Sequence, residues 1–204
     1  MPVTLTTTRE LAGSSGVKCA IYSRGGLGKT LLCATAPNPL IISAEKGMLT
    51  LRHYDVPVIE VQTMAEMWEV FNWLKDDPAA AIYQTICIDT VSEIAEKVLT
   101  AALPTVKNKM QAYNMMLIDM VTLLKAFRDL LPGRNVVALA EEGFNKDEIT
   151  GVSTYGPTFP GGNLIAKFPH IFDEMFQITF IQQPGPNNTT TELRVLKTQP
   201  DLTT

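Results

Sequence analysis

The chain has few of the features that mark exported, membrane-bound or metal-rich proteins. Its 204 residues include three cysteines, Cys19, Cys33 and Cys87, which lie in apolar contexts without the spacing of a metal or redox motif. No apolar run approaches the length that spans a bilayer, and the N-terminus lacks the basic-then-apolar pattern of a signal peptide. We therefore expect reduced core cysteines, no membrane association and a cytoplasmic location.

The chain also lacks a strong net charge and internal repeats. Its formal charge of −4 provides no global attraction to nucleic acid, so any such binding requires a local basic patch. A hydrophobic content of 46% over 204 residues is sufficient for one full core. We expect a Thr- and Ser-rich arm over residues 1–15 and a single domain over residues 16–204.

What the sequence does contain is a glycine-rich segment directly after an apolar run. Residues 23–30 read Ser-Arg-Gly-Gly-Leu-Gly-Lys-Thr and follow a predicted strand. A strand, a glycine-rich turn and a helix that begins at Gly-Lys-Thr are typical of the phosphate-binding P-loop, whose backbone N–H groups converge on phosphates. Ser23 replaces the first glycine of the motif and fits only if its φ stays negative. The predicted nucleotide-binding residues are Ser23, Arg24, Gly25, Gly26, Leu27, Gly28, Lys29 and Thr30.

Short apolar runs alternate with helical periodicity along the rest of the chain. This alternation is typical of an α/β protein with a mostly parallel sheet covered by helices. The expected strands are 17–22, 39–43, 57–61, 84–88 and 135–140, with two later strands near 174–181 and 191–197 that extend the sheet antiparallel. The expected helices are 29–35, 63–75, about 91–103 and about 111–131.

Carboxylates follow two of the predicted strands. Strand 84–88 is followed by Asp89, which is the Walker B pattern of P-loop enzymes, where the carboxylate would hold Mg²⁺ through a water or through Thr30, whose hydroxyl can also ligate the ion. Glu45 lies just past strand 39–43, at the edge of a parallel sheet where ligands and catalytic groups gather. Glu45 is the candidate for polarising the attacking water; the alternative is a solvated loop carboxylate paired with Lys46. Lys29 would bridge the β- and γ-phosphates.

Taken in order, these segments resemble RecA-type ATPases, and more narrowly the phage-encoded RecA-like proteins that act as single-strand annealing recombinases. The resemblance covers about residues 17–200 and includes the P-loop, the strand end at Glu45, the Asp89 strand and a late Gly-Gly-Asn segment. It implies a RecA-like P-loop NTPase fold, with ATP and Mg²⁺ as ligands. Glu141 stands where RecA-like proteins place a neutral or basic sensor of the γ-phosphate, so it is a sensor candidate that departs from the family pattern.

Residues 143–162 resemble the mobile DNA-binding loop of RecA-type proteins. Glycines let backbone amides approach phosphates, and aromatic side chains stack on bases. Because the loop has few cations, we expect weak binding of single strands, or binding only in an assembly. The alternative is an ordinary surface loop. The candidate DNA-contacting residues are Lys146, Tyr155, Phe159, Gly161, Gly162, Asn163 and Lys167.

The last predicted strand resembles the RecA strand whose cations reach the ATP of a neighbouring subunit. On this resemblance Lys197 is the first choice for that role and Arg194 the second. The implied protein is a DNA-dependent ATPase that anneals single-stranded DNA as a homo-oligomer, a ring or a filament, in the host cytoplasm, with a single-strand-binding protein as a further partner. Two alternatives stay open: a nucleotide-gated loading protein with little catalysis, and a small-molecule kinase, which the lack of an Arg-rich lid disfavours.

Overall fold

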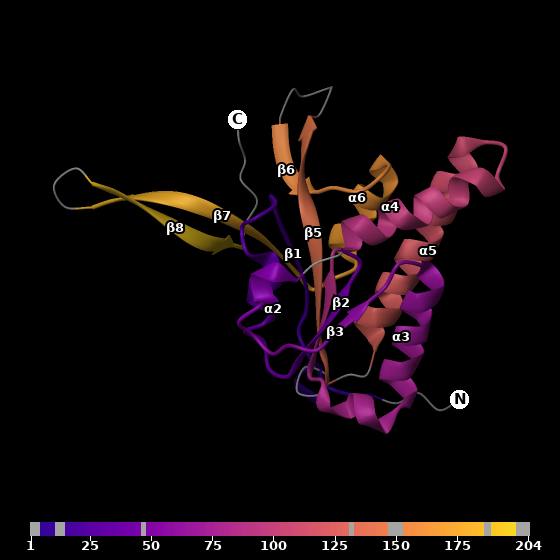
Figure 1. Cartoon of the computed structure of the whole chain (residues 1–204), viewed down its shortest axis with the longest axis horizontal. Coiled ribbons are helices and arrows are strands. Elements are labelled where there is room, and N and C mark those ends of the chain that lie inside the picture. Colours follow the sequence, from indigo (N-terminus) through magenta and orange to yellow (C-terminus); the bar gives the residue numbers. More distant parts are fainter. Residues whose placement is uncertain are drawn as a thin grey trace.

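The computed structural model describes residues 5–10, 15–45, 48–130, 133–146, 153–185 and 189–198, and it consists of an eight-stranded sheet flanked by helices (Figure 1). The strands lie in the order β3-β2-β4-β5-β1-β7-β8, and β6 pairs with β5. The strands are β1 (Lys18–Ser23), β2 (Pro39–Ser43), β3 (Val58–Glu60), β4 (Thr85–Asp89), β5 (Asn135–Lys146), β6 (Ser153–Pro157), β7 (Glu174–Pro184) and β8 (Thr190–Lys197). The helices are α2 (Lys29–Cys33), α3 (Met64–Asp76), α4 (Val91–Ala102), α5 (Lys109–Asp129) and α6 (Gly162–Lys167), with 3-10 turns η1 (Leu49–Leu51), η2 (Pro78–Ile82), η3 (Leu103–Thr105) and η4 (Phe168–His170).

Parallel pairing dominates the sheet. All neighbours from β3 through to β7 run parallel, whereas β8 pairs antiparallel with β7 and β6 pairs antiparallel with β5. This confirms the predicted fold class, a mostly parallel α/β sheet with antiparallel C-terminal strands. The expectation that both late strands extend the sheet antiparallel is wrong for β7, which runs parallel to β1. The reason is that α6 precedes β7 and carries the chain back across the sheet, as crossover connections do.

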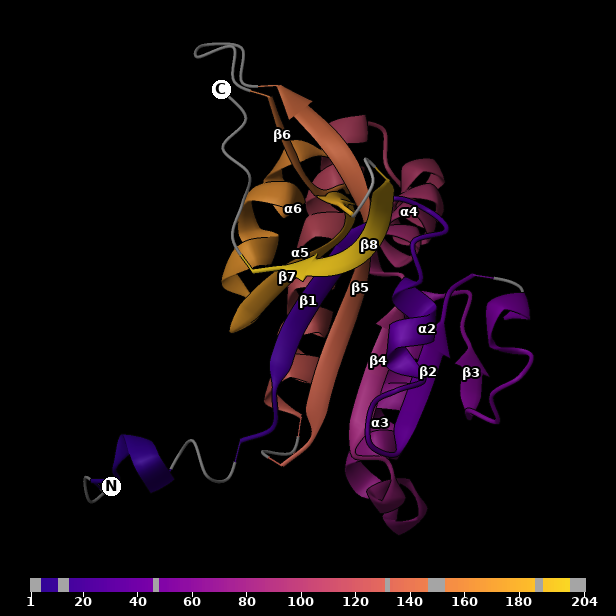
Figure 2. The ribbon, with the colours of Figure 1, turned by 90° about the vertical axis from the view of Figure 1, so that its left-hand side faces the viewer.

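Apolar layers cover both faces of the sheet. Helices α3, α4, α5 and α6 form one layer, which packs on Ile86 and Ile88 of β4. On the other face α2 and η1 form a smaller cluster, which includes Cys87 of the same strand. Figure 1 shows α3 and α5 on one side of the strands, and Figure 2 turns the molecule so that α2 faces the viewer. Strands buried on both faces have near-continuous apolar sequences, which explains why the predicted ends of β1, β2 and β4 lie within one residue of the observed ends.

Side-chain caps fix where the longer helices begin. The Thr63 hydroxyl accepts the Glu66 N–H at 3.2 Å, while the Glu66 carboxylate accepts the Thr63 N–H at 3.1 Å, so α3 begins with a capping box. The side chains of Thr90 and Asn108 likewise accept backbone N–H groups at the starts of α4 and α5. The predicted helix starts agree within two residues, but the helix predicted over 29–35 ends at Cys33.

The segment expected to be a mobile loop is partly a β-hairpin. Strand β5 does not end at residue 140 but continues to Lys146, and β6 pairs with its outer half, with Phe144 opposite Tyr155. The two rings meet edge to face at 5.4 Å, a cross-strand aromatic pair that stabilises such hairpins. The expectation of a loop over 143–162 is therefore wrong for residues 143–146 and 153–157, and residues 147–152 lie outside the described part.

The cysteines lie in the core. Cys19, Cys33 and Cys87 are buried and free, as predicted. Burial raises the pKa of the Cys19 thiol to about 11, which keeps it in the unreactive thiol form at neutral pH. In the part of the chain that the structure describes, no helix combines the length and the apolar character needed to cross a bilayer.

Candidate active site

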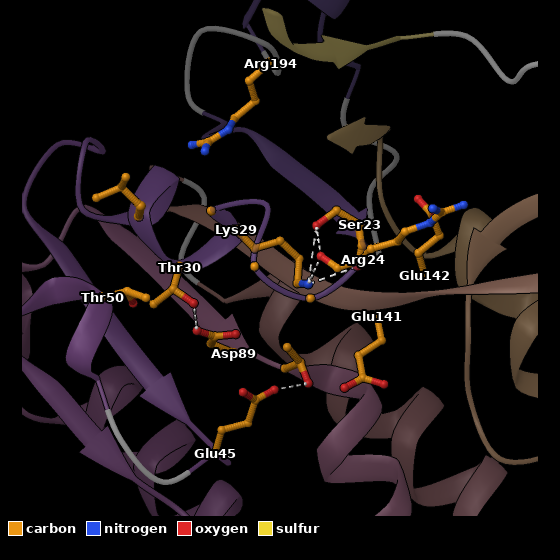
Figure 3. Close-up of a pocket in the computed structure, with 15 residues that line it drawn as sticks. Ser23, Arg24, Lys29, Thr30, Glu45, Thr50, Asp89, Glu141, Glu142 and Arg194 are labelled. Atoms are coloured by element: carbon orange, nitrogen blue, oxygen red, sulfur yellow. Dashed lines mark hydrogen bonds and ion pairs between the residues drawn. The ribbon is translucent and has the colours of Figure 1, made fainter. Parts of the chain in front are cut away.

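The carboxyl ends of β1, β2 and β4 and the middle of β5 meet at one edge of the sheet and surround a pocket of about 590 Å³ (Figure 3). Polar groups converge at this edge of parallel sheets because the loops that follow the strands open there. The pocket is lined by Ser23, Arg24, Gly25, Gly26, Gly28, Lys29, Thr30, Leu31, Glu45, Thr50, Asp89, Thr90, Glu141, Glu142 and Arg194.

The glycine-rich segment has the backbone that the P-loop motif requires. Gly26 and Gly28 have φ of 79° and 89°, a region in which a side chain would be strained. Ser23 is fully buried at the end of β1, and Asn38 is the sole non-glycine residue with positive φ in the described part of the chain. Serine at the first motif position is therefore compatible with the loop.

Lys29 is buried inside its own loop. Its Nζ donates to the Ser23 carbonyl oxygen at 3.0 Å, to the Ser23 hydroxyl at 3.4 Å and to the Arg24 carbonyl oxygen at 3.4 Å. The loop thus holds the ammonium group in the pocket through two backbone carbonyl oxygens and the Ser23 hydroxyl. Phosphate oxygens entering the pocket would meet a positive charge that is already positioned.

Thr30 and Asp89 form the next part of the site. The Thr30 hydroxyl donates to Asp89 Oδ2 at 2.6 Å, and burial raises the pKa of Asp89, with the nearby Glu45 charge acting in the same direction. A hydroxyl and one carboxylate are hard oxygen donors suited to Mg²⁺. No group of three or more His, Cys, Asp or Glu side chains among the described residues could hold a metal by itself. The donor set therefore fits Mg²⁺ that keeps phosphate and water ligands.

Glu45 reaches the pocket from the end of β2 and is fixed there by Thr90. The Thr90 hydroxyl donates to Glu45 Oε1 at 3.1 Å and accepts the Glu93 N–H, the cap of α4, at 3.3 Å. The Ser43 hydroxyl also donates to the backbone oxygen of Glu45 at 2.8 Å. Lys46, the partner in the alternative interpretation, lies outside the described residues. Sequence reasoning missed Thr90, although a threonine directly before a predicted helix is a recognisable cap.

Lys97 of α4 braces the same strand end. Its ammonium group donates to the Ala44 carbonyl oxygen and to Gln62 Oε1, the latter at 2.9 Å, and lies 3.6 Å from Glu93. The Ala44 N–H donates to the Asp89 carbonyl oxygen at 2.8 Å. These contacts tie the end of β2 to β4 and α4, so that Glu45 and Asp89 keep a fixed relation. No sequence pattern signals Lys97.

Two acidic residues end the buried part of β5. The Glu141 side chain faces the pocket, and its backbone N–H donates to the Ser92 hydroxyl at 3.0 Å. Glu142 accepts from Arg24 Nε at 3.2 Å and from Gln177 at 2.8 Å. The Arg24 guanidinium also lies 5.3 Å from the centre of the Tyr155 ring. A P-loop arginine thus contacts the β5–β6 hairpin, a connection that the sequence does not reveal.

The structure places Arg194, not Lys197, at this chain's pocket. The guanidinium of Arg194 lies against Gly28, where an added Cβ would be 2.7 Å from Nη1, and it lies 5.7 Å from the Phe180 ring centre. Among the described residues that line the pocket, Arg194 is the one contributed by β8. The predicted role of Lys197, or of Arg194 as second choice, at the ATP of a neighbouring subunit stays a prediction.

The candidate DNA-contacting residues separate into exposed and buried ones. Phe159 is buried, with its ring centre 4.7 Å from that of Phe168, so the expectation that it offers a stacking surface is wrong. Tyr155 is exposed on β6, and Lys167 is exposed in the last turn of α6. Gly161, Gly162 and Asn163 are exposed where α6 begins. Lys146 ends β5, and its side chain lies outside the described part.

The fold and the pocket together define an α/β P-loop protein with a nucleotide-binding site of the ATPase type. A family model described as an AAA domain matches residues 15–204, and the chain belongs to this AAA domain family. No curated protein shows significant similarity to the chain. Membership indicates nucleotide binding and ATPase activity, in agreement with the P-loop reading of residues 23–30.

Proposed function

We propose that the protein is a Mg²⁺-dependent ATPase that binds single-stranded DNA and promotes strand annealing in phage recombination. The observation that carries the ATPase part is the convergence of Lys29, the Thr30–Asp89 pair and the Thr90-fixed Glu45 in one pocket. Each group has a separate role in hydrolysis, and together they come from segments at the ends of β1, β2 and β4.

The pocket residues divide the chemical work. The P-loop backbone and Lys29 bind the phosphates, and Thr30 and Asp89 would hold Mg²⁺. When bound, this ion neutralises charge on the transferred phosphoryl group. Glu45, held by the Thr90 hydroxyl, orients the attacking water and accepts its proton.

A groove beside α6 supports the DNA part of the proposal. It has a volume of about 360 Å³ and lies between the start of α5 and residues 160–164. Met110 and Tyr113 of α5 line it and are exposed, and an added Cβ on Gly161 would be 3.0 Å from the Tyr113 ring. An exposed aromatic ring beside accessible backbone amides suits a base and its phosphate. Lys107 and Lys109 are exposed at the start of α5 and supply positive charge nearby.

Ser92 links this groove to the ATPase pocket. Its hydroxyl donates to the Thr158 carbonyl oxygen at 2.8 Å and accepts the Glu141 N–H, while the Thr158 N–H donates to the Glu141 oxygen at 2.8 Å. The segment that leads into residues 160–164 is therefore bonded to Glu141 in the middle of β5 and to Ser92 in the first turn of α4, three residues after Asp89. This chain of contacts supports a DNA-dependent turnover.

The assembly and partners follow from the same proposal. We take the protein to act as a homo-oligomer, a ring or a filament, with residues 16–204 as one domain and Lys197 directed at a neighbouring subunit. Single-stranded DNA is the principal partner and a single-strand-binding protein a further one, in the cytoplasm of the phage host. These statements rest on the resemblance to RecA-like recombinases.

The test is Mg²⁺-ATP turnover with and without single-stranded DNA. We expect stimulation by DNA in the wild type, loss of turnover in Lys29→Ala, and retained basal turnover without stimulation in Tyr113→Ala. Equal turnover with and without single-stranded DNA would refute the recombinase part and favour a nucleotide-gated loading protein. Turnover that requires a small phosphoryl acceptor would favour a kinase.

A further inference from the structure

The proposed hydrolysis uses Lys29 of the P-loop but not Arg24, the second cation of that loop. The Arg24 side chain is 67% exposed and lines the phosphate pocket. Its Nε donates to Glu142 Oε1 at 3.2 Å, and its guanidinium lies 5.3 Å from the centre of the Tyr155 ring. In the described part of the chain neither terminal nitrogen of Arg24 bonds an acceptor. The donors of both nitrogens are therefore available to a ligand in the pocket.

Glu142, the partner of Arg24, is a buried carboxylate. Its side chain is 5% exposed, and Gln177 of β7 donates to its Oε2 at 2.8 Å. A buried carboxylate needs a partner for its charge, and among the residues that the structure describes Arg24 is the cation that bonds it. The pair thus joins a buried anion to an exposed cation. Of the two groups, the exposed arginine is the one whose side chain can turn to a ligand in the pocket.

Arg24 stands at the end of the pocket that would take the outer phosphates. In P-loop proteins the loop backbone cradles the α- and β-phosphates, and the lysine reaches the β- and γ-phosphates. The Lys29 Nζ donates to the Arg24 carbonyl oxygen at 3.4 Å, so Arg24 is next to the group that reaches the outer phosphates. Figure 3 shows Asp89 on one side of Lys29 and Arg24 on the other. Groups that attract the outer phosphates are thus present on both sides of Lys29, the Mg²⁺ donors on one and Arg24 on the other.

We infer that Arg24 recognises the third phosphate of the nucleotide bound to its own chain, and that it leaves Glu142 to do so. This inference rests on the proposed function, in which a nucleoside triphosphate occupies the pocket. A guanidinium pairs with phosphate as it does with carboxylate, so a terminal phosphate is an alternative partner for Arg24. A diphosphate lacks that group and leaves the Arg24–Glu142 pair intact. Arg24 therefore favours ATP over ADP, and Glu142 limits this preference because it competes for the guanidinium.

Binding of a triphosphate and of a diphosphate tests this role of Arg24. Isothermal titration measures the Mg²⁺ complexes of ADP and of the non-hydrolysable β,γ-imido analogue of ATP. The proteins are the wild type, Arg24→Gln, Glu142→Gln and the control Arg52→Gln. Arg52 is a matched control because it is exposed, donates from its Nε to His53 at 2.9 Å and does not line the pocket.

The expected changes in affinity differ between the two nucleotides. Arg24→Gln should lose about tenfold in affinity for the triphosphate, because a charge-assisted pair is lost, and should keep its ADP affinity, which also shows that the variant is folded. Glu142→Gln should bind the triphosphate a few-fold more tightly, because the competing carboxylate is gone. The control should change neither affinity.

The exchange of partners can be observed at Tyr155. In Tyr155→Trp an indole replaces the ring beside the Arg24 guanidinium, while the native Trp68 and Trp73 both belong to α3 and do not line the pocket. We expect the fluorescence of this variant, corrected for that of the wild type, to change with the triphosphate analogue but not with ADP. The same variant combined with Arg24→Gln should respond to neither nucleotide.

Four results would overturn the inference and leave the proposed function intact. These are equal losses of triphosphate and ADP affinity in Arg24→Gln, unchanged affinity for both, weaker triphosphate binding in Glu142→Gln, and a Tyr155→Trp signal that does not distinguish the nucleotides. Binding of neither nucleotide by the wild type would overturn the proposed function itself and the inference with it. Lys29→Ala, which should lose both nucleotides, separates the two kinds of failure.

Discussion

Thr90 is the residue whose removal most directly tests how the site is built. In Thr90→Ala the hydroxyl that caps α4 and bonds Glu45 is lost. Loss of a helix cap and of one further hydrogen bond costs about 1–2 kcal/mol of unfolding free energy, which lowers the melting temperature by about 2–8 °C in a chain of this size. Release of Glu45 lowers kcat by about 10- to 100-fold, because a small displacement of a catalytic group is costly, while KM changes little.

Two further variants separate capping from catalysis. Thr90→Ser keeps the hydroxyl and should retain most of the stability and turnover. Thr63→Ala removes the cap of α3, which lies away from the pocket, and should lower the melting temperature by a similar amount without lowering kcat. Thermal unfolding and Mg²⁺-ATP turnover are measured on all three. The reasoning fails if Thr90→Ala loses stability with kcat intact, or if Thr63→Ala loses as much turnover.

Two other residues give predictions of a different kind. Burial raises the pKa of Asp89 above its ordinary value of 3.8. The folded wild type therefore loses stability as the pH rises from 3.8 through the raised pKa, and above that pKa the free energy of unfolding is lowered by the full amount. Nucleotide-free Asp89→Asn should therefore melt above the wild type at pH 7, with a difference that vanishes below pH 3.8; thermal scans across pH that show no such convergence would contradict this. Because Arg194 lies at its own chain's P-loop, mixing Arg194→Ala with Lys29→Ala protein should restore no turnover, and recovery in the mixture would show that Arg194 acts on a neighbouring subunit.

The sheet was predictable because its central strands are buried on both faces. Strands such as β4 are continuous apolar runs in the sequence. An apolar run this short between two predicted helices is more readily assigned to a buried strand than to a further helix. The outer half of β5 was not predictable in the same way. Residues 141–146 are polar in part, and their strand conformation depends on pairing with β6, which the local sequence does not encode.

The site residues also differ in whether local sequence or tertiary pairing determines their position. Lys29, Thr30 and Asp89 belong to contiguous motifs, so their convergence follows from the order of strands in a parallel sheet. The choice between Arg194 and Lys197 depends on the pairing of β8 with β7, which sets the face on which each side chain lies. Arg194 and Lys197 are three residues apart on β8, so their side chains lie on opposite faces of the strand, and a register slip of one residue would exchange those faces. The contact of Arg24 with Glu142 joins residues 118 apart in sequence, beyond any local pattern.

The charges in the pocket explain why the two halves of the proposed function would be connected. Glu45, Asp89 and Glu141 line the pocket, so a triphosphate arriving without a divalent cation would meet repulsion, and the proposed function requires the Mg²⁺ complex. On the other wall, Arg24 is already paired with Glu142 and stacked on Tyr155 of the hairpin. Phosphates bound at the P-loop would compete with Glu142 for this guanidinium, because it is an attractive partner for both. The hairpin that carries Tyr155 would therefore respond to nucleotide through a single P-loop side chain.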